Sequence, residues 1–259
     1  MKQNLSIVKI GGNVIENEAE LQVFLQLFSA MDGLKILVHG GGRKATQMLE
    51  KLGLKPKMIN GRRITDAESL DVIIMVYGGL TNKKIVAQLQ ANNCNAIGLS
   101  GADGNTIQAH KRPVKEIDYG FAGDVDGINE KTISDLLGAG LTPVFCALTH
   151  DLKGQILNTN ADTIASTLAI GLSEIYETTL YYCFEKKGVL MNVNDEGSVI
   201  KHIDSKKYGQ LLQDGIIADG MLPKLENCFK ALNKNVHKVC IGDISMIDPT
   251  SKLFTTITL

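Results

Sequence analysis

The segment LSIVKIGGN, residues 5–13, places a short apolar run directly before two glycines, and LKILVHGGG, residues 34–42, repeats the pattern. Val and Ile favour strands, and the glycines end each run where a helix can start. Between the two runs, residues 19–30 (AELQVFLQLFSA) have the apolar spacing of a helix. A strand, a helix and a second strand in this order predict a parallel β-α-β unit.

The same alternation continues along the chain. Residues 102–128 interrupt it with a polar, glycine-bearing stretch, which we interpret as a β-hairpin. Earlier in the chain, Thr65-x-x-Glu68 has the form of a capping box at the start of a helix. The whole pattern predicts an α/β fold with a largely parallel sheet covered on both faces. Helices are predicted over residues 45–52, 65–76, 81–93, 130–137, 161–171, 206–214 and 222–232, and strands over 96–99, 141–148 and 177–184.

Composition narrows the function classes. The 259 residues contain 27 Lys and Arg against 28 Asp and Glu, a net charge of −1, and 44% are hydrophobic. This balance argues against a disordered chain and against a general nucleic-acid binder. There is no apolar run of about 18 residues and no signal-peptide pattern at the start, so we expect a cytoplasmic protein without a membrane span. The five cysteines form no Cys-x-x-Cys pair, so we expect buried, reduced thiols and no structural metal site.

The two strand–glycine turns are candidate anion sites, because glycines there expose backbone N–H groups. Neither turn is a Walker A loop, and no Gly-x-Gly-x-x-Gly is present. Lys9 lies inside an apolar strand, so its ammonium must meet an anion or reach water. Lys224 falls in the first turn of a predicted helix, where the dipole disfavours a cation. A bound anion or simple solvent exposure would explain that position.

Polar residues also gather before the helix predicted at residue 161. Asn158, Asn160 and Asp162 stand at alternate positions, which fits either ordinary helix caps or a ligand shell in which Asp162 orients lysines. In NGRRIT, residues 60–65, either Arg62 or Arg63 could clamp a carboxylate, and spacing alone does not decide between them.

Taken together, seven motifs occur in the order and spacing of the N-acetylglutamate kinases, and the chain therefore resembles that branch of the amino-acid kinase family over residues 5–235. The resemblance implies a three-layer αβα sandwich formed by residues 1–259 as a single kinase domain. Its N-lobe, about residues 1–172, would bind the acyl-glutamate, and its C-lobe, about 173–259, would bind ATP. The motifs are VKIGGN, VHGGG, NGRRIT, GLSGADG, GDVDGIN, LNTNAD and GIIADGMLPK.

The resemblance also implies roles for individual residues. The phosphate-contacting lysines of the family fall on Lys9 and Lys224, and its organising aspartate falls on Asp162. The cofactor would be ATP with Mg²⁺, the metal being held mainly by the nucleotide phosphates, so no protein metal ligand is expected. The acceptor-binding positions are Gly41, Gly42, Arg63 and Asn158, and the nucleotide-binding positions are Gly11, Gly12 and Lys224.

The implied reaction moves the γ-phosphate of ATP to the γ-carboxylate of N-acetyl-L-glutamate, a step of arginine biosynthesis. A glutamate carboxylate, with a pKa near 4.3, is ionised at pH 7, so no general base is required. Positioning and charge neutralisation would then supply the catalysis. An N-succinyl acceptor and a non-catalytic sensor of amino acid and ATP are the alternatives. We expect family members acting on glutamate, aspartate, carbamate or UMP to fit less well, because no extra basic cluster lies near the glycine turns and we expect no additional C-terminal domain.

Two segments on the nucleotide side depart from the family pattern. Residues 184–188 read FEKKG where a Ser-Asp-Val-x-Gly-like segment is usual, and residues 255–257 read TTI in place of Gly-Thr-x-Ile. Four residues precede the first strand, so we expect a homodimer without the N-terminal helix of arginine-inhibited hexamers and without arginine feedback.

The apolar side chains of the helices near residues 65–93 would pack on the sheet or contact the partner; they are Leu70, Ile73, Ile74, Ile85, Val86 and Leu89.

Overall fold

The computed structural model describes residues 2–59, 61–217 and 221–259, so Asn60 of NGRRIT and residues 218–220 of GIIADGMLPK lie outside the described part. The elements in chain order are β1 (Asn4–Ile10), α1 (Gly12–Glu16), α2 (Glu18–Ala30), β2 (Leu34–His39), α3 (Gly42–Lys51), β3 (Lys57–Ile59), β4 (Arg62–Ile64), α4 (Ala67–Ile74), η1 (Met75–Thr81), α5 (Asn82–Ala91), β5 (Ala96–Leu99), η2 (Asp103–Asn105), β6 (Ile107–Lys111), β7 (Gly123–Ile128), α6 (Glu130–Gly138), β8 (Thr142–Cys146), β9 (Leu148–His150), β10 (Ile156–Asn158), α7 (Ala161–Leu172), β11 (Glu177–Cys183), β12 (His202–Ile203), α8 (Ser205–Gln213), α9 (Leu222–Leu232), β13 (Lys238–Gly242), η4 (Ile244–Ile247) and β14 (Thr255–Ile257).

The central sheet runs through the whole molecule. Within the described residues it has eight strands, in the order β12-β14-β13-β11-β1-β2-β8-β5. β1 pairs in parallel with β11 on one side and with β2 on the other, and β8 and β5 continue the parallel arrangement. β14 runs antiparallel to β13. The prediction of a mainly parallel sheet is therefore confirmed.

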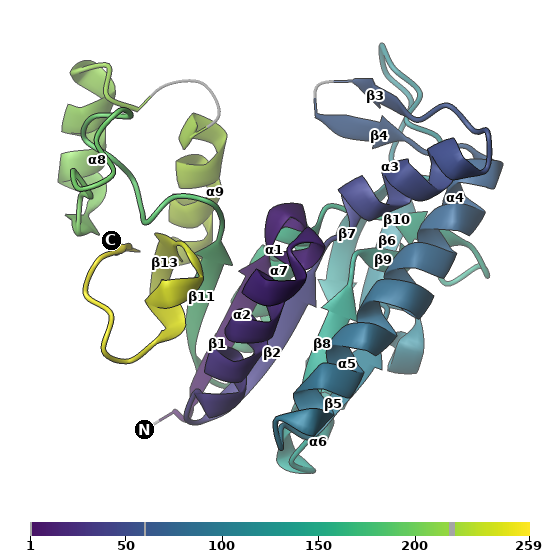
Figure 1. The fold of residues 1–259 in the computed structure, drawn as a ribbon, viewed down its shortest axis with the longest axis horizontal. Coiled ribbons are helices and arrows are strands. Elements are labelled where there is room, and N and C mark those ends of the chain that lie inside the picture. The colour runs from purple at the N-terminus through teal and green to yellow at the C-terminus, as the bar shows by residue number, and fades with distance from the viewer. Residues whose placement is uncertain (1, 60, 218–220) are drawn as a thin grey trace.

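Helices cover both faces of this sheet, because the central strands are apolar on both sides. Ile7 and Val8 are neighbours in β1 and both are fully buried. Val8 belongs to an apolar cluster with side chains of α2 and α5, which lie on the near face in Figure 1, whereas Ile7 belongs to a second cluster that includes side chains of α7 and α9. The three-layer αβα sandwich follows from this alternation.

A smaller sheet stands above the carboxyl ends of the central strands (Figure 1). In the described part of the chain it has the order β10-β9-β6-β7, and β6 pairs antiparallel with β7. The hairpin predicted within residues 102–128 is thus confirmed. The hairpin β3–β4 lies at the same end and forms a separate antiparallel pair.

Two local predictions are wrong. Thr65 does not cap a helix; its backbone pairs with the hairpin loop through Tyr119 and Phe121. Asp66 is the N-cap of α4, and its carboxylate accepts from the backbone N–H of Ser69 at 2.9 Å. The predicted helices 65–76 and 81–93 are also not separate, since the π-helical turn η1 joins α4 to α5. Of the six apolar residues named in these two helices, four are buried in the core: Leu70, Ile73, Ile85 and Leu89. The prediction that these side chains pack inside the molecule is confirmed for those four.

The strand predicted over residues 141–148 is divided. β8 ends at Cys146 and belongs to the central sheet, and β9 begins at Leu148 and belongs to the smaller sheet. Between them the carbonyl of Ala147 accepts from the backbone N–H of Thr159. One apolar run therefore serves two sheets.

Candidate functional site

Two hollows lie at the carboxyl ends of the central strands, on either side of the start of α7. The glycine hollow is lined by the turn at residues 40–42, by Arg62, Arg63 and Arg112, and by residues 158–161. The lysine hollow is lined by Lys9, Asp162, Tyr182, Cys183, Phe184, Lys224, Asn227 and Ile241. The first turn of α7 thus contributes to both hollows. In parallel α/β sheets, ligands bind at this edge.

The turn at residues 40–42 gives the glycine hollow its shape. Gly41 is the N-cap of α3, and a Cβ atom there would lie 2.8 Å from Cδ1 of Tyr77. A side chain at this position would collide with the ring, so a glycine is required. The first N–H groups of a helix have no intrahelical partner. This turn therefore presents backbone donors to an anion in the hollow.

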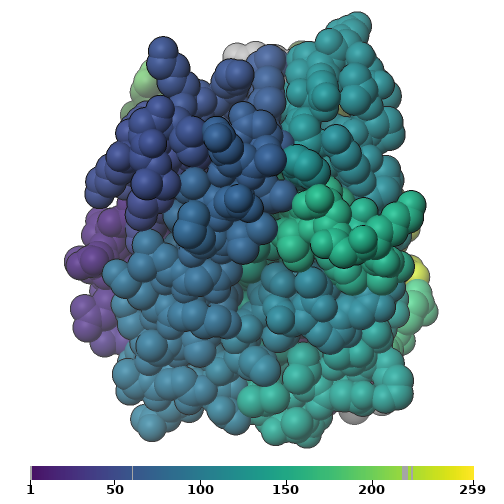
Figure 2. Space-filling view, turned by 90° about the vertical axis from the view of Figure 1, so that its right-hand side faces the viewer, coloured from purple at the N-terminus to yellow at the C-terminus, as the bar shows by residue number. Residues whose placement is uncertain are grey.

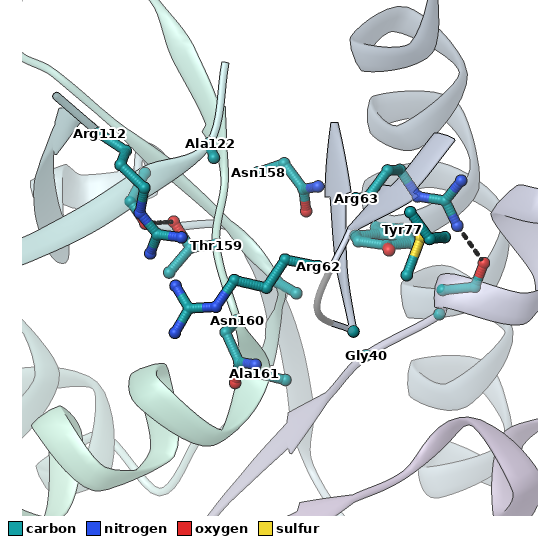
Figure 3. A pocket seen from close by; sticks show the side chains of 16 residues that line it. Gly40, Arg62, Arg63, Tyr77, Arg112, Ala122, Asn158, Thr159, Asn160 and Ala161 are labelled. Carbon is teal, nitrogen blue, oxygen red and sulfur yellow. Dashed lines mark hydrogen bonds between the residues drawn. The ribbon is translucent and has the colours of Figure 1, made fainter. Parts of the chain in front are cut away.

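Arg63 is the buried cation of the glycine hollow. Its residue is 8% exposed, and its Nη2 donates to the carbonyl of Gly42 at 2.9 Å and to Oγ1 of Thr46 at 2.7 Å (Figure 3). Its Nη1 is buried without a hydrogen-bond partner in the described structure. An unpaired buried donor on a guanidinium is costly. Arg63 also lines the hollow, where its guanidinium can pair with a carboxylate.

The polar residues before α7 differ in their hydrogen-bonding roles. Asn160 is the N-cap, and its Oδ1 accepts from the N–H groups of Asp162 and Thr163. Asn158 ends β10 and lines the glycine hollow, where its Nδ2 donates to Oγ1 of Thr65 at 3.0 Å. That bond fixes the orientation of the Asn158 amide, so its Oδ1 has a defined direction.

Lys9 and Asp162 form the centre of the lysine hollow. The Nζ of Lys9 lies 2.7 Å from Oδ1 of Asp162, and the two side chains are 16% and 36% exposed. Asp162 stands in the first turn of α7, where the helix dipole favours a carboxylate. The hydroxyl of Tyr182 donates to the main-chain carbonyl of Asp162 at 3.2 Å. The ammonium in the apolar strand therefore has its anion, and part of it still faces the hollow.

Lys224 reaches the same hollow from α9. It is exposed, and its Nζ lies 4.7 Å from the centre of the Phe184 ring. This cation–π contact holds the side chain beside β11. Phe184 is the first residue of the departing segment FEKKG, so that segment contacts one of the predicted phosphate-binding lysines.

Gly11 and Gly12 follow β1 and begin α1. Gly11 has a φ of −83°, which any residue adopts, and a Cβ atom there would have its nearest contact at 3.8 Å. At Gly12 the nearest contact would be 3.9 Å. Neither backbone geometry nor packing requires glycine at these positions, in contrast to Gly41. Close approach of a ligand to the backbone is the remaining reason for them.

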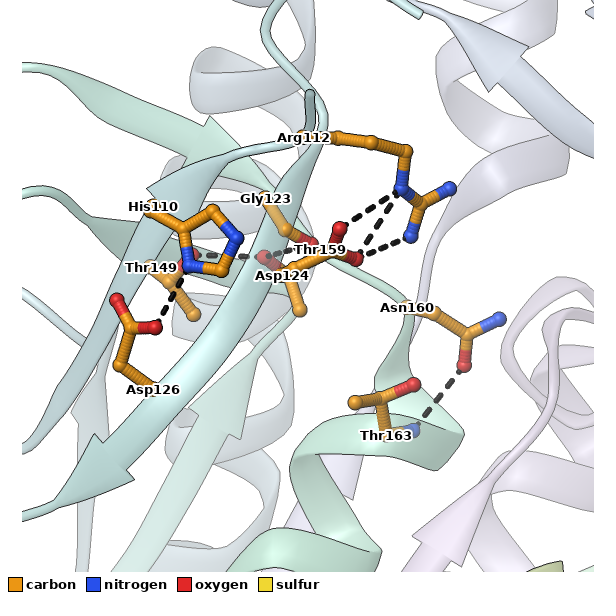
Figure 4. A network of polar contacts seen from close by, with 9 residues as sticks. All are labelled: His110, Arg112, Gly123, Asp124, Asp126, Thr149, Thr159, Asn160 and Thr163. Carbon is orange, nitrogen blue, oxygen red and sulfur yellow. Dashed lines mark hydrogen bonds and ion pairs between the residues drawn. The ribbon is translucent and has the colours of Figure 1, made fainter. Parts of the chain in front are cut away.

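The outer wall of the glycine hollow carries further arginines. Arg112 holds Asp124 through its Nε and Nη2, with Nε 3.1 Å from each carboxylate oxygen (Figure 4). This guanidinium lowers the pKa of the Asp124 carboxyl, and Asp124 raises the pKa of Arg112. Figure 3 shows the guanidinium groups of Arg62 and Arg112 on the opposite side of the hollow from that of Arg63.

The structure brings most of the predicted residues together. Gly41, Gly42, Arg63 and Asn158 line the glycine hollow. Lys9, Asp162 and Lys224 line the lysine hollow. Gly11 and Gly12 belong to the lining of neither, although they follow directly on the strand that carries Lys9.

Tyr77, Arg112 and Tyr182 are site residues that the sequence reasoning did not select. The pair Gly78-Gly79 is the one signal near Tyr77, because adjacent glycines in a helix mark an irregular turn. Arg112 and Tyr182 have no distinguishing local pattern.

A sequence model of the amino acid kinase family matches residues 4–243. The chain belongs to the amino acid kinase family. A protein of Bacteroides fragilis named acetylglutamate kinase is 54% identical to this amino acid kinase over 247 residues, which is 95% of each chain. One of the same name in Cytophaga hutchinsonii is 52% identical, covering 92% of this chain and 91% of its own.

A solved structure agrees with this assignment of the fold. The protein smu.665 of Streptococcus mutans UA159 has a TM-score of 0.75 and 26% sequence identity, with 98% of both chains covered. The similarity thus extends over nearly the whole of both chains.

Residues 255–257, the second segment that departs from the family pattern, contribute to the packing of this amino acid kinase. Thr255 is fully buried, and its Oγ1 accepts from the N–H of Val189 at 2.8 Å and donates to the carbonyl of Ile200 at 2.7 Å. It therefore ties the loop after FEKKG to β14. All five cysteines are buried and unpaired in the described structure, which confirms that prediction.

Among the described residues, no helix is both long and apolar enough to cross a membrane. No group of three His, Cys, Asp or Glu side chains in that part of the chain is arranged to hold a metal ion.

Proposed function

We propose that this amino acid kinase transfers the γ-phosphate of ATP to the γ-carboxylate of N-acetyl-L-glutamate, in arginine biosynthesis. The observation that carries the proposal is the shared start of α7. It places the Lys9–Asp162 pair in one hollow directly beside a second hollow that contains a buried, partly unpaired arginine. The names of the relatives from Bacteroides fragilis and Cytophaga hutchinsonii support the same substrate.

The acceptor would occupy the glycine hollow. The guanidinium of Arg63 would pair with the α-carboxylate, and the N–H groups of Gly41 and Gly42 would add backbone donors. The Oδ1 of Asn158 would accept from the N–H of the acylated amine. These three contacts would aim the γ-carboxylate at the lysine hollow.

The lysine hollow would take the phosphates. Lys9 and Lys224 would neutralise the charge that spreads over the transferring phosphoryl group, with backbone donors from Gly11 and Gly12. Asp162 is already paired with Lys9 at 2.7 Å, so its part is to orient that lysine rather than to accept a proton. The acceptor carboxylate is ionised at neutral pH, and no base is needed.

ATP would arrive as its Mg²⁺ complex. Asp162 is the one carboxylate among the described residues that line the lysine hollow, and it already has a partner. The protein therefore offers no ligand cage, and the nucleotide phosphates would hold the metal. When bound, Mg²⁺ adds positive charge against the β- and γ-phosphates.

The two lobes would divide the work. Acceptor groups such as Arg63 and Asn158 come from residues 1–172, and Lys224 with Phe184 comes from residues 173–259. We assign the acceptor to the first lobe and ATP to the second.

N-succinyl-L-glutamate is the second candidate acceptor. It carries one carboxylate more than the acetyl compound. The favouring observation is that Arg62 and Arg112 line the glycine hollow in addition to Arg63. Asp124 already pairs with Arg112, so Arg62 is the guanidinium that would meet the extra carboxylate.

We further propose a cytoplasmic homodimer. The face formed by α4, η1 and α5, blue in Figure 2, exposes Met75 and Leu80 on η1. Leu152, between β9 and β10, is exposed as well. A second copy of the chain would cover such apolar side chains. Sedimentation equilibrium is expected to give a dimer, and a hexamer would contradict this assignment.

A hydroxylamine trap tests the activity, because an acyl phosphate reacts with hydroxylamine to give a hydroxamate, which forms a coloured complex with added ferric iron. Purified protein with Mg-ATP is given N-acetylglutamate, N-succinylglutamate, glutamate or no acceptor. We expect signal with an N-acylated glutamate and its loss in Lys9→Ala. The matched control is Lys131→Ala, an exposed lysine in a surface pair with Asp135, which should keep the signal.

The pattern of signals separates the candidates. A stronger signal with the succinyl acceptor that Arg62→Ala abolishes would establish the second candidate. ATP binding without turnover of any acceptor would contradict a kinase and favour the sensor.

A further inference from the structure

A fully buried histidine lies directly below the turn of the glycine hollow. His39 is the last residue of β2 and is 0% exposed. Its Nδ1 lies 2.7 Å from the carbonyl oxygen of Gly40. A carbonyl oxygen only accepts, so Nδ1 carries the proton and Nε2 is left as an acceptor.

Asn82 satisfies that acceptor. Its Nδ2 lies 3.1 Å from Nε2 of His39 and 2.9 Å from the carbonyl oxygen of Val144 in β8, and its residue is 1% exposed. Its Oδ1 accepts from Nζ of Lys83 at 3.2 Å. The partners on both ends of the amide fix its orientation. A chain of hydrogen bonds therefore runs from β8 and α5 to the glycine turn.

The charge state of His39 agrees with this tautomer. Burial, with smaller contributions from Lys44 and Lys83, lowers the pKa of His39 to about 4, although its bond to Gly40 opposes the shift. The ring is thus neutral at pH 7. An imidazolium would direct an N–H from Nε2 at the amide NH₂ of Asn82, where no acceptor stands.

The Gly40 carbonyl matters because of peptide planarity. The carbonyl of Gly40 and the N–H of Gly41 belong to one peptide plane and point in opposite directions across it. Because His39 Nδ1 donates to the carbonyl oxygen of Gly40, it also fixes the direction of the Gly41 N–H, which points to the opposite side of the same peptide plane. Gly41 lines the glycine hollow.

We propose that His39 is a positioning residue for acceptor binding, which acts through the Gly40 carbonyl and is itself held in one tautomer by Asn82. It touches neither acceptor nor nucleotide. The inference rests on the proposed function for the identity of the acceptor, whereas the tautomer of His39 is independent of it.

Three substitutions separate positioning from simple packing. Asparagine places its amide nitrogen where Nδ1 of histidine stands, and glutamine places its own near Nε2. His39→Ala is expected to raise the KM for N-acetylglutamate about tenfold, the effect of one lost hydrogen bond, with the KM for ATP changed less than about twofold. His39→Asn should recover most of that loss, and His39→Gln should not.

Ile36→Ala is the matched control, since Ile36 is fully buried in the same strand but away from the turn. We expect it to lower the melting temperature without a selective rise in the acceptor KM. The proposal is overturned if His39→Asn and His39→Gln behave alike, or if His39→Ala raises both KM values equally.

Nitrogen-15 NMR of the unliganded protein gives the readout that needs no activity. We expect His39 to show a protonated Nδ1 and an unprotonated Nε2 at pH 7, and Asn82→Leu to broaden or shift that signal. A protonated Nε2 would overturn the inference even if the kinase is active. Absence of turnover with a correct tautomer would instead contradict only the proposed function.

Discussion

The two glycine turns of the site look alike in sequence but differ in what surrounds them. Tyr77 lies so close to Gly41 that a Cβ atom would collide with its ring, whereas a Cβ atom at Gly11 or Gly12 would have no contact closer than 3.8 Å. On the glycine-hollow side, Arg63 and His39 bond to the carbonyls of Gly42 and Gly40. The fold therefore fixes the turn on the proposed acceptor side in advance, and the turn on the proposed nucleotide side keeps room for a ligand.

This contrast teaches that a glycine motif has two distinct physical causes. At one turn the protein itself requires the small residue, and at the other a ligand is the remaining reason. Substitutions on the two sides should consequently differ in kind. Those on the acceptor side would change stability or acceptor binding, and those on the nucleotide side would change turnover or ATP binding alone.

The largest effect is expected for Lys9→Ala. Removing one preorganised charge from the transferring phosphoryl group should lower kcat about a thousandfold, equal to ~4 kcal/mol of transition-state stabilisation. Steady-state kinetics with saturating ATP and acceptor measure it. The acceptor KM should change little, and a loss confined to KM would mean that Lys9 binds substrate rather than stabilising the transition state.

The second effect is a loss of stability in acid that originates on the acceptor side. Burial lowers the pKa of His39 from 6.5 to about 4. Between these two pH values, the imidazole is protonated in the unfolded chain but neutral in the native protein. The stability that the neutral His39 contributes is fully present above pH 6.5 and is lost progressively as the pH falls. The loss in the free energy of unfolding reaches about 3 kcal/mol near pH 4.

Urea unfolding from pH 7 down to pH 4 measures this slope, and His39→Asn should lack that part of it. Equal slopes in the two proteins would show that His39 is not the residue that titrates. Thr178→Val, at another fully buried polar position, is the control that should keep the slope.

Third, Arg63→Lys is expected to raise the acceptor KM about thirtyfold, or ~2 kcal/mol, because a lysine keeps the charge but loses the fork. The KM for ATP should stay near its original value. Arg62→Lys, one residue away but exposed, is the matched variant and should change the KM for N-acetylglutamate far less. The opposite ranking would make Arg62 the acceptor-binding residue.

The smallest effect, and the sharpest comparison, comes from alanine at the two turns. Gly11→Ala should leave the free energy of unfolding within about 0.5 kcal/mol and raise the KM for ATP about tenfold. Gly41→Ala should cost about 1–3 kcal/mol of stability through its clash with Tyr77. A destabilised Gly11→Ala protein would remove the distinction between the two turns.

Much of the layered fold could be predicted from local sequence. The apolar runs of β1 and β2 end in glycine, and the helix predicted over residues 222–232 coincides with α9. The division of residues 141–148 could not be predicted, because the change of sheet at Ala147 depends on a hydrogen bond from Thr159. Thr65 likewise does not form the predicted N-cap, because its backbone pairs with the hairpin loop, a contact distant in sequence.

The candidate site was predictable where the residue type was unusual for its position. A lysine in an apolar strand drew attention to Lys9, and Asp162 is the anion that it meets. The choice between Arg62 and Arg63 needed the family resemblance, and the structure gives its physical basis, since Arg63 is buried and Arg62 is exposed. Tyr77 was missed because its position depends on the π-helical turn η1.

The first turn of α7 lines both hollows, with Ala161 on one side and Asp162 on the other. An α-helix rises about 1.5 Å per residue and resists bending over so short a span. In the proposed binding mode, this rigid start of α7 sets the separation of the phosphoryl donor and the acceptor. In the proposed binding mode, by contrast, the walls around the acyl group come from the β3–β4 hairpin and Arg112, which lie outside this helix. A new acceptor could thus be accommodated by changing the hairpin alone, with the path of the phosphoryl group left intact.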